Sequence, residues 1–137
     1  MVATDSQIKR FDNITYPIQE ETYQIIGICM EIHRILGKGL LEIVYKDALE
    51  YETKSRNIPY EREKKYEVHY KEIILPHHFY ADFVMFNSII VEIKAQKKGI
   101  IDEHYNQMIN YLAVSKCKIG LLFNFGDDSM KYKRIIL

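Results

Sequence analysis

Three ionisable side chains interrupt two neighbouring apolar segments near the middle of the chain. Asp82 lies in the first segment, and Glu92 and Lys94 lie in the second. Burying an unpaired ion is costly, so such groups are usually paired with each other, bound to a metal or left at an exposed edge. The spacing alone leaves three interpretations open: a buried Asp82 or Glu92 paired with Lys94, an edge strand that exposes these groups, and a metal site built from the two acids.

Two carboxylates on adjacent strands would supply the hard oxygen ligands that Mg²⁺ and Mn²⁺ prefer, with coordination positions left open. An ion of this kind activates water and offsets negative charge as a phosphodiester bond breaks. Lys94 follows Glu92 by two residues and therefore points to the same side of its strand. Its ammonium group could orient the attacking water or stabilise the transition state. The pattern favours phosphodiester hydrolysis as the reaction class.

The spacing of the two acids also constrains the turn between their segments. Side chains alternate between the faces of a strand, so a two-residue turn at Asn87-Ser88 would put Asp82 and Glu92 on opposite faces. A shared metal needs both on one face. We therefore predict a three-residue loop over residues 86–88, or an equivalent bulge, with Asp82 across from Glu92. The side chains expected to pack on the opposite face are Phe83, Met85, Val91 and Ile93.

Two helices are expected before this hairpin. Residues 1–17 form a polar N-terminal segment, and an apolar stripe of helical period then predicts a helix over residues 18–36 that ends at Gly37-Lys38-Gly39. A second helix is expected over residues 40–56, before a proline. The side chains expected to point inward are Ile18, Tyr23, Ile25, Ile26, Cys29, Met30, Ile32, His33 and Leu36 in the first helix and Leu41, Val44, Tyr45, Ala48 and Leu49 in the second.

Strands and one further helix make up the rest of the chain. A period of two predicts a strand from residue 60, a break is expected at Pro76, and further strands are expected over residues 79–86, 89–95, 119–125 and 132–137. Asp102 is expected to cap a helix that reaches residue 115. The packing stripe expected for this helix is Tyr105, Met108, Ile109 and Leu112. The result is one α/β domain over residues 18–137, a mixed β-sheet flanked by helices in the order ααβββαββ.

Asp82 followed by Glu92-Ile93-Lys94 resembles the D…ExK signature of the PD-(D/E)XK nuclease-like superfamily. In the exonuclease-like branch of that superfamily, a glutamate on a preceding helix and a Gln-x-x-x-Tyr pair on the following helix complete the site. Glu42, Gln107 and Tyr111 stand at the matching places of this chain.

Residues 39–45 match the pattern that names the GxxExxY protein family. Further segments that resemble this family are residues 33–39, 81–84, 91–95 and 120–126. The resemblance spans residues 18–126 and implies a restriction-endonuclease-like core. It also implies a divalent-metal-dependent nuclease, a hydrolase acting on DNA or RNA. The alternative is a non-catalytic domain that binds nucleic acid or a protein.

The resemblance implies a role for each site residue. Asp82, Glu92 and Glu42 would hold Mg²⁺ or Mn²⁺ and, with Lys94, form the catalytic set. The residues implied in substrate binding are Gln107, Tyr111, His104 and Tyr45. Each of these satellite residues also has a structural interpretation: the helix dipole favours Glu42 near a helix N-terminus, Tyr45 is a core aromatic, Gln107 and Tyr111 form an ordinary helix face, and His104 is a structural histidine.

Composition limits the partners. Lys plus Arg and Asp plus Glu each number 19, so the chain has no net charge that would attract a polyanion. Three short basic clusters, at residues 62–65, 94–98 and 131–134, are only weak evidence for nucleic-acid binding. The N-terminus lacks the apolar core of a signal peptide, so we expect a cytoplasmic protein without a membrane span. Cys29 and Cys117 are expected to be reduced, and a homodimer is compatible with the sequence.

Overall fold

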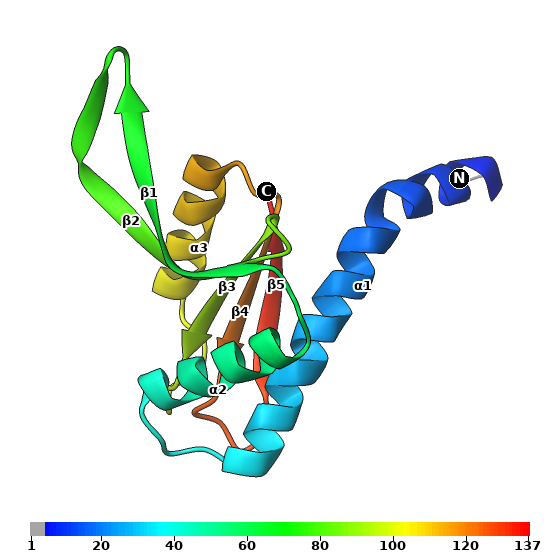
Figure 1. Cartoon of the computed structure of the whole chain (residues 1–137), viewed down its shortest axis with the longest axis vertical. Coiled ribbons are helices and arrows are strands. Elements are labelled where there is room, and N and C mark those ends of the chain that lie inside the picture. The colour runs from blue at the N-terminus through cyan, green and yellow to red at the C-terminus, as the bar shows by residue number, and fades with distance from the viewer. Residues whose placement is uncertain (1–4) are drawn as a thin grey trace.

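The computed structural model describes residues 5–137, with side chains from residue 18 onward. The elements follow the predicted order ααβββαββ (Figure 1). They are α1 (Asp5–Leu36), α2 (Glu42–Ser55), β1 (Tyr60–Tyr70), β2 (Ile73–Met85), β3 (Ile89–Lys94), α3 (Asp102–Ser115), β4 (Ile119–Asn124) and β5 (Lys131–Ile136).

One five-stranded mixed sheet organises the chain. The strands lie in the order β1-β2-β3-β4-β5, and all neighbours are antiparallel except β3 and β4, which α3 connects as a parallel crossover. Helices α1 and α2 cover one face of the sheet and α3 covers the other (Figure 1). The near-continuous apolar character of β3 and β4 follows from this double cover, as the sequence predicted.

The β2–β3 turn has the predicted odd length. Met85 pairs with Ile89 and Phe83 pairs with Val91, which leaves residues 86–88 as a three-residue loop. Phe86 and Asn87 adopt φ values of 55° and 58°, and the Ser88 amide donates to the Met85 carbonyl at 3.1 Å. The register prediction is therefore confirmed. As predicted, the set that packs toward α1 and α2 is Phe83, Met85, Val91 and Ile93.

The boundaries of three elements differ from the prediction. Helix α1 begins at Asp5 rather than near residue 18, so it continues through Pro17 at the cost of a backbone hydrogen bond. Strand β2 begins at Ile73 and includes Pro76, which falls where the β1–β2 register is irregular and no ladder donor is needed. Asp102 is the first residue of α3 and not its cap, a position that Ile101 takes.

Several side chains predicted to point inward are exposed instead. Leu41 and Tyr23 are 74% and 58% exposed, and the other exposed members of the predicted stripes are Met30, Leu36, Val44 and Ile109. Single apolar residues are common on protein surfaces, so the helical period alone made the buried stripes too wide. Cys29 is buried and Cys117 partly buried, and both are free thiols. No helix in residues 5–137 is long and apolar enough to cross a membrane.

Gly126, just beyond β4, lies against the backbone of Gln96, just beyond β3. A methyl group added at Gly126 would come within 2.6 Å of the Gln96 amide nitrogen, and a backbone cannot yield as a side chain can. We expect Gly126→Ala to lower the free energy of unfolding by about 1–3 kcal/mol, measured by urea denaturation. Gly27→Ala is the control, because nothing lies within 4 Å of its added methyl and α1 should gain stability. A Gly126→Ala protein as stable as wild type would contradict this packing.

Candidate metal and active site

Asp82 and Glu92 are locked together where the β2–β3 ladder ends. Beyond the Phe83–Val91 pair, the Asp82 amide donates to Glu92 Oε2 at 3.2 Å, and the Ile93 amide donates to Asp82 Oδ2 at 2.8 Å. Each carboxylate thus takes a backbone hydrogen bond from the opposite strand. The two acids are only 8% and 2% exposed, so the predicted juxtaposition is present and largely shielded from water.

The two acids divide one proton between them. Burial raises the pKa of Glu92 well above its ordinary value, and the hydrogen bond and charge of Asp82 raise it further. Burial also opposes ionisation of Asp82, but hydrogen bonds from Glu92, the Ile93 amide and Lys46 together lower its pKa. The pair therefore favours an ionised Asp82 beside a protonated Glu92. Among the described residues, Glu92 Oε1 has no hydrogen-bond partner.

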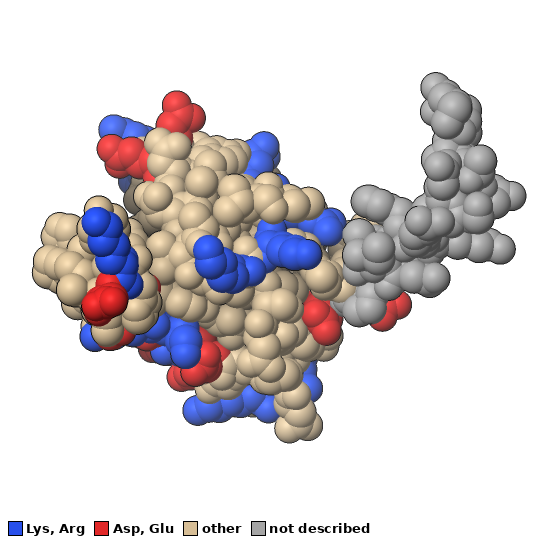
Figure 2. All heavy atoms as spheres, turned by 90° about the horizontal axis from the view of Figure 1, so that it is seen from above, with Lys and Arg blue, Asp and Glu red and all other residues tan. Residues whose placement is uncertain are grey.

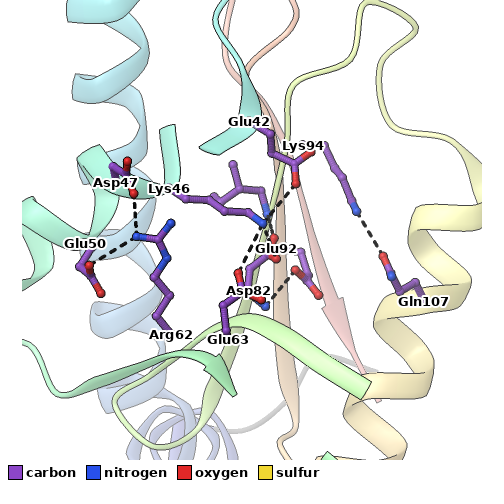
Figure 3. A network of polar contacts seen from close by, with 11 residues as sticks. Glu42, Lys46, Asp47, Glu50, Arg62, Glu63, Asp82, Glu92, Lys94 and Gln107 are labelled. Atoms are coloured by element: carbon purple, nitrogen blue, oxygen red, sulfur yellow. Dashed lines mark hydrogen bonds and ion pairs between the residues drawn. The ribbon is translucent and has the colours of Figure 1, made fainter. Parts of the chain in front are cut away.

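A lysine that sequence reasoning missed lies at the centre of the acids (Figure 3). Lys46 Nζ is 2.9 Å from Asp82 Oδ1, 3.3 Å from Glu42 Oε1 and 3.6 Å from Glu63 Oε1. Its side chain is 13% exposed. Burial disfavours its charge, but the hydrogen bond and charge of Asp82, together with the charges of Glu42 and Glu63, outweigh that effect and raise the pKa of Lys46. The ammonium group occupies the place where a cation among these carboxylates would be expected.

Two glycines and one tyrosine bring Glu42 into the cluster. Gly37 and Gly39 adopt φ values of +71° and +99°, which let the chain reverse between α1 and α2. The Tyr45 hydroxyl donates to the Gly37 carbonyl at 2.6 Å and accepts from the Leu40 amide at 3.2 Å. Helix α2 therefore starts beside the hairpin, and Glu42, its first residue, shares the Lys46 ammonium with Asp82. This is the placement that a site role for Glu42 requires.

Tyr45 packs into the core beside the start of α2. It is fully buried and stacks on Phe125 with ring centroids 4.5 Å apart. Its hydroxyl is occupied by the backbone of the α1–α2 connection. In this structure the bulk of Tyr45 belongs to the core and its hydroxyl holds the entry to α2, whereas the implied role of Tyr45 in substrate binding stays a prediction.

Helix α3 brings its predicted residues to the other side of the acids. Lys94 Nζ donates to Gln107 Oε1 at 3.3 Å, so this lysine turns toward α3 rather than toward Asp82 (Figure 3). Tyr111 is buried on the α3 side of the sheet, where its ring lies edge-on to Phe79 with centroids 5.8 Å apart, and burial raises its pKa.

His104 has a structural partner at the start of α3. Its Nδ1 accepts a hydrogen bond from the Ile101 amide at 3.2 Å, which satisfies one of the free donors of the helix N-terminus. Burial, and after it the charge of Lys94, lowers its pKa. The neutral ring is thus suited to the backbone bond, and a substrate contact for His104 stays a prediction.

The donor set fits a hard divalent cation, although the side chains do not stand in coordinating positions. Among the described side chains, residues 18–137, no three of His, Cys, Asp or Glu converge closely enough to bind an ion as they are. The Lys46 ammonium holds Glu42, Glu63 and Asp82 around itself instead. The unpaired Oε1 of Glu92, buried beside Asp82, is the kind of oxygen that a bound ion would satisfy.

Basic and acidic side chains are both present on the face that Figure 2 displays, which is the molecule of Figure 1 seen from above. Within the predicted cluster at residues 62–65, Arg62 pairs with Asp47 at 2.8 Å and with Glu50 at 3.4 Å. The charge of Arg62 is therefore offset by acids of the same chain, which agrees with the weakness of this cluster as evidence for nucleic-acid binding.

The fold and the acid–lysine hairpin define a class, namely nuclease-like domains whose site is built on two adjacent strands. The chain belongs to the PD-(D/E)XK nuclease superfamily, whose family model matches residues 19–135. A search of curated proteins found no match. The crystal structure of SSO0001 is similar in fold, with a TM-score of 0.53 and 24% identity over 68% of this chain. This chain spans 48% of that one.

The structural role of Tyr45 can be tested by removing its hydroxyl. Tyr45→Phe leaves the Gly37 carbonyl and the Leu40 amide without their partner. We expect a loss of about 1–3 kcal/mol in the free energy of unfolding, measured by urea denaturation. Tyr51→Phe, on the same helix but 70% exposed, should change stability little. Equal stability of the two variants would show that the Tyr45 hydroxyl does not hold this connection.

The raised pKa of Glu92 makes stability depend on pH. Between the ordinary pKa of 4.5 and the raised value, the folded protein retains a proton that the unfolded chain has released, so stability falls as pH rises. The lowered pKa of Asp82 has the opposite effect: its contribution to the stability of the folded protein is lost only as pH falls below the ordinary pKa of 3.8. We expect Glu92→Gln to stabilise the metal-free protein above neutral pH by about 1–3 kcal/mol.

Thermal unfolding in EDTA across pH 5 to 8 checks this expectation. The melting temperature of the wild type should decline over that range, whereas that of Glu92→Gln should decline less. Glu72→Gln, an exposed change near the tip of the β1–β2 hairpin, should keep the wild-type slope. Parallel curves for wild type and Glu92→Gln would mean that Glu92 is ionised in the folded protein.

Proposed function

We propose that this chain is a divalent-metal-dependent nuclease that hydrolyses phosphodiester bonds in DNA or RNA. One observation supports this most directly: Asp82 and Glu92 are held side by side and buried, with an oxygen of Glu92 left unpartnered. A scaffold gains little from two buried acids, because their desolvation must be offset by a proton kept on Glu92 and by the ammonium of Lys46. Membership in the nuclease superfamily agrees with this function.

In this proposal, Asp82 and Glu92 hold Mg²⁺ or Mn²⁺, and Glu42 is the further acidic ligand. The bound ion would supply Lewis-acid assistance and offset the charge that builds up at phosphorus. Glu92 must release its proton for the ion, so metal affinity rises with pH.

The remaining residues of the site act on water and on the phosphodiester. Water adds to phosphorus as the P–O ester bond breaks, and the leaving oxygen takes up a proton. Lys94, held by Gln107 at 3.3 Å, is placed to orient that water or to stabilise the developing negative charge. Gln107 and Tyr111 would position the substrate from α3. His104 would assist only if it exchanged its backbone bond for a substrate group.

Finer assignments belong to the same proposal. The match of residues 39–45 to the GxxExxY pattern supports placing the chain in that family within the superfamily. A nucleic-acid substrate in the cytoplasm fits this assignment. A homodimer stays a prediction from the sequence alone, and nothing in the site requires a second copy.

The catalytic test uses isosteric changes. Asp82→Asn, Glu92→Gln and Lys94→Met should each reduce Mg²⁺- or Mn²⁺-dependent cleavage of labelled DNA and RNA by about a hundredfold or more, because the first two remove ligands of the proposed ion and the third removes the positive charge at the reacting phosphate. EDTA should abolish cleavage by the wild type. Glu72→Gln removes an acid outside the site and serves as the control.

Two results would contradict the proposal. Cleavage that survives all three substitutions would have to come from another site or another protein. A wild type that binds nucleic acid or a protein, and neither binds Mn²⁺ nor cleaves, would favour the non-catalytic alternative.

A further inference from the structure

Lys46 is the cation of this site in the absence of a metal. It lies one helical turn after Glu42 on α2, and its ammonium contacts carboxylates from three different elements, Glu42 on α2, Glu63 on β1 and Asp82 on β2. The other lysine of the site, Lys94, is turned to Gln107 and does not share this task. Among the described residues, Lys46 is therefore the only basic side chain that pairs with these three acids.

The ammonium and a divalent ion compete for the same oxygens. Lys46 Nζ stands 2.9 Å from Asp82 Oδ1, whereas Mg²⁺ requires oxygen ligands at about 2.0–2.1 Å. The carboxylates would have to close in on the ion, and a lysine ammonium held at that distance from Asp82 would then be repelled by it. Both cations cannot occupy the centre together.

A single ammonium also leaves the cluster incompletely neutralised. Three acids, Glu42, Glu63 and Asp82, pair with the one ammonium of Lys46, and the buried Oε1 of Glu92 has no hydrogen-bond partner among the described residues. A divalent ion would supply the missing positive charge, and the Glu92 oxygen could coordinate it. The flexible four-carbon stem of lysine, on a helix whose neighbouring Glu42 is partly exposed, allows the ammonium to move outward.

We propose that Lys46 is an exchangeable internal cation: it holds the acids together in the metal-free protein and is displaced when the divalent ion binds. This inference rests on the proposed function, because it assigns a metal to the same acids. Displacement limits metal affinity, since the ion must replace three ion pairs. Displacement also frees the ammonium group of Lys46, which could then pair with a phosphate of the substrate.

Mn²⁺ titration by calorimetry tests the exchange. Lys46→Met should bind Mn²⁺ about tenfold more tightly than wild type or better, because the competing charge is gone. Lys46→Arg retains the charge and should bind no more tightly than wild type. Lys54→Met, which removes an exposed lysine nearer the C-terminal end of the same helix, should change the affinity less than twofold. Lys46→Met that binds Mn²⁺ equally or more weakly would overturn the exchange.

A second measurement uses the wild type and does not depend on folding of the variant. Acetylation of Lys46, followed by mass spectrometry, should be slow in EDTA and several-fold faster with saturating Mg²⁺, while acetylation of Lys54 should not respond. Unchanged protection of Lys46 in Mg²⁺ would also overturn the exchange.

The two proposals fail in different ways. If the wild type cleaves nucleic acid but Lys46→Met binds Mn²⁺ no more tightly and Lys46 stays protected, the exchange alone is wrong. If Mn²⁺ displaces Lys46 but no nucleic acid is cleaved, the nuclease function is wrong and the exchange stands. If neither wild type nor Lys46→Met binds Mn²⁺, both are wrong.

Discussion

The crossed hydrogen bonds between Asp82 and Glu92 are the constraint on which this structure depends. At this position two side chains accept the amide protons that a regular ladder would give to carbonyl groups. The ladder therefore ends in a pair of acids, and both must lie on one face of the sheet. This arrangement needs the odd-length loop at residues 86–88, because a one-residue slip would move every side chain of the strand to the other face.

Two buried acids at this distance destabilise the fold unless a cation or a proton compensates them. The structure uses both means, a proton on Glu92 and the ammonium of Lys46 on Asp82. The position of α2 follows from the same need, since its first two turns contribute Glu42 and Lys46. Tyr45 lies between these two residues in sequence but points into the core, where its hydroxyl fixes the chain reversal that delivers both of them.

Local patterns predicted much of the fold and part of the site. The element order follows from periodicity and turn residues, and the three-residue loop follows from the requirement that Asp82 and Glu92 share a face. The bounds of α1 and β2 could not be read from the sequence, because Pro17 and Pro76 each suggest a break that the helix and the irregular register tolerate. Leu41 was predicted to be buried but is exposed, because a helical period does not say how wide the buried stripe of a helix is.

Lys46 and Glu63 could not be found in the same way, because their places depend on how α2 and β1 pack against the hairpin. One local signal did exist: Lys46 follows Glu42 by four residues, and such pairs share a helix face. That signal is common on exposed helices, where it contributes only about 0.3–0.5 kcal/mol. Only the tertiary contact with Asp82 separates this lysine from an ordinary surface pair.

The charge balance of the whole chain hides a strong local asymmetry. Equal numbers of acids and bases give no net field, yet the site gathers several acids around one ammonium and stays negative without further cations. A phosphodiester brought to this cluster would meet repulsion from Asp82 and Glu42. Because the basic groups at Arg62 are neutralised by Asp47 and Glu50, they offer little relief. Lys46 does not carry enough positive charge to offset these acids, so binding of the proposed substrate requires a further cation. In the proposed function, the metal and the phosphate should therefore each strengthen the binding of the other.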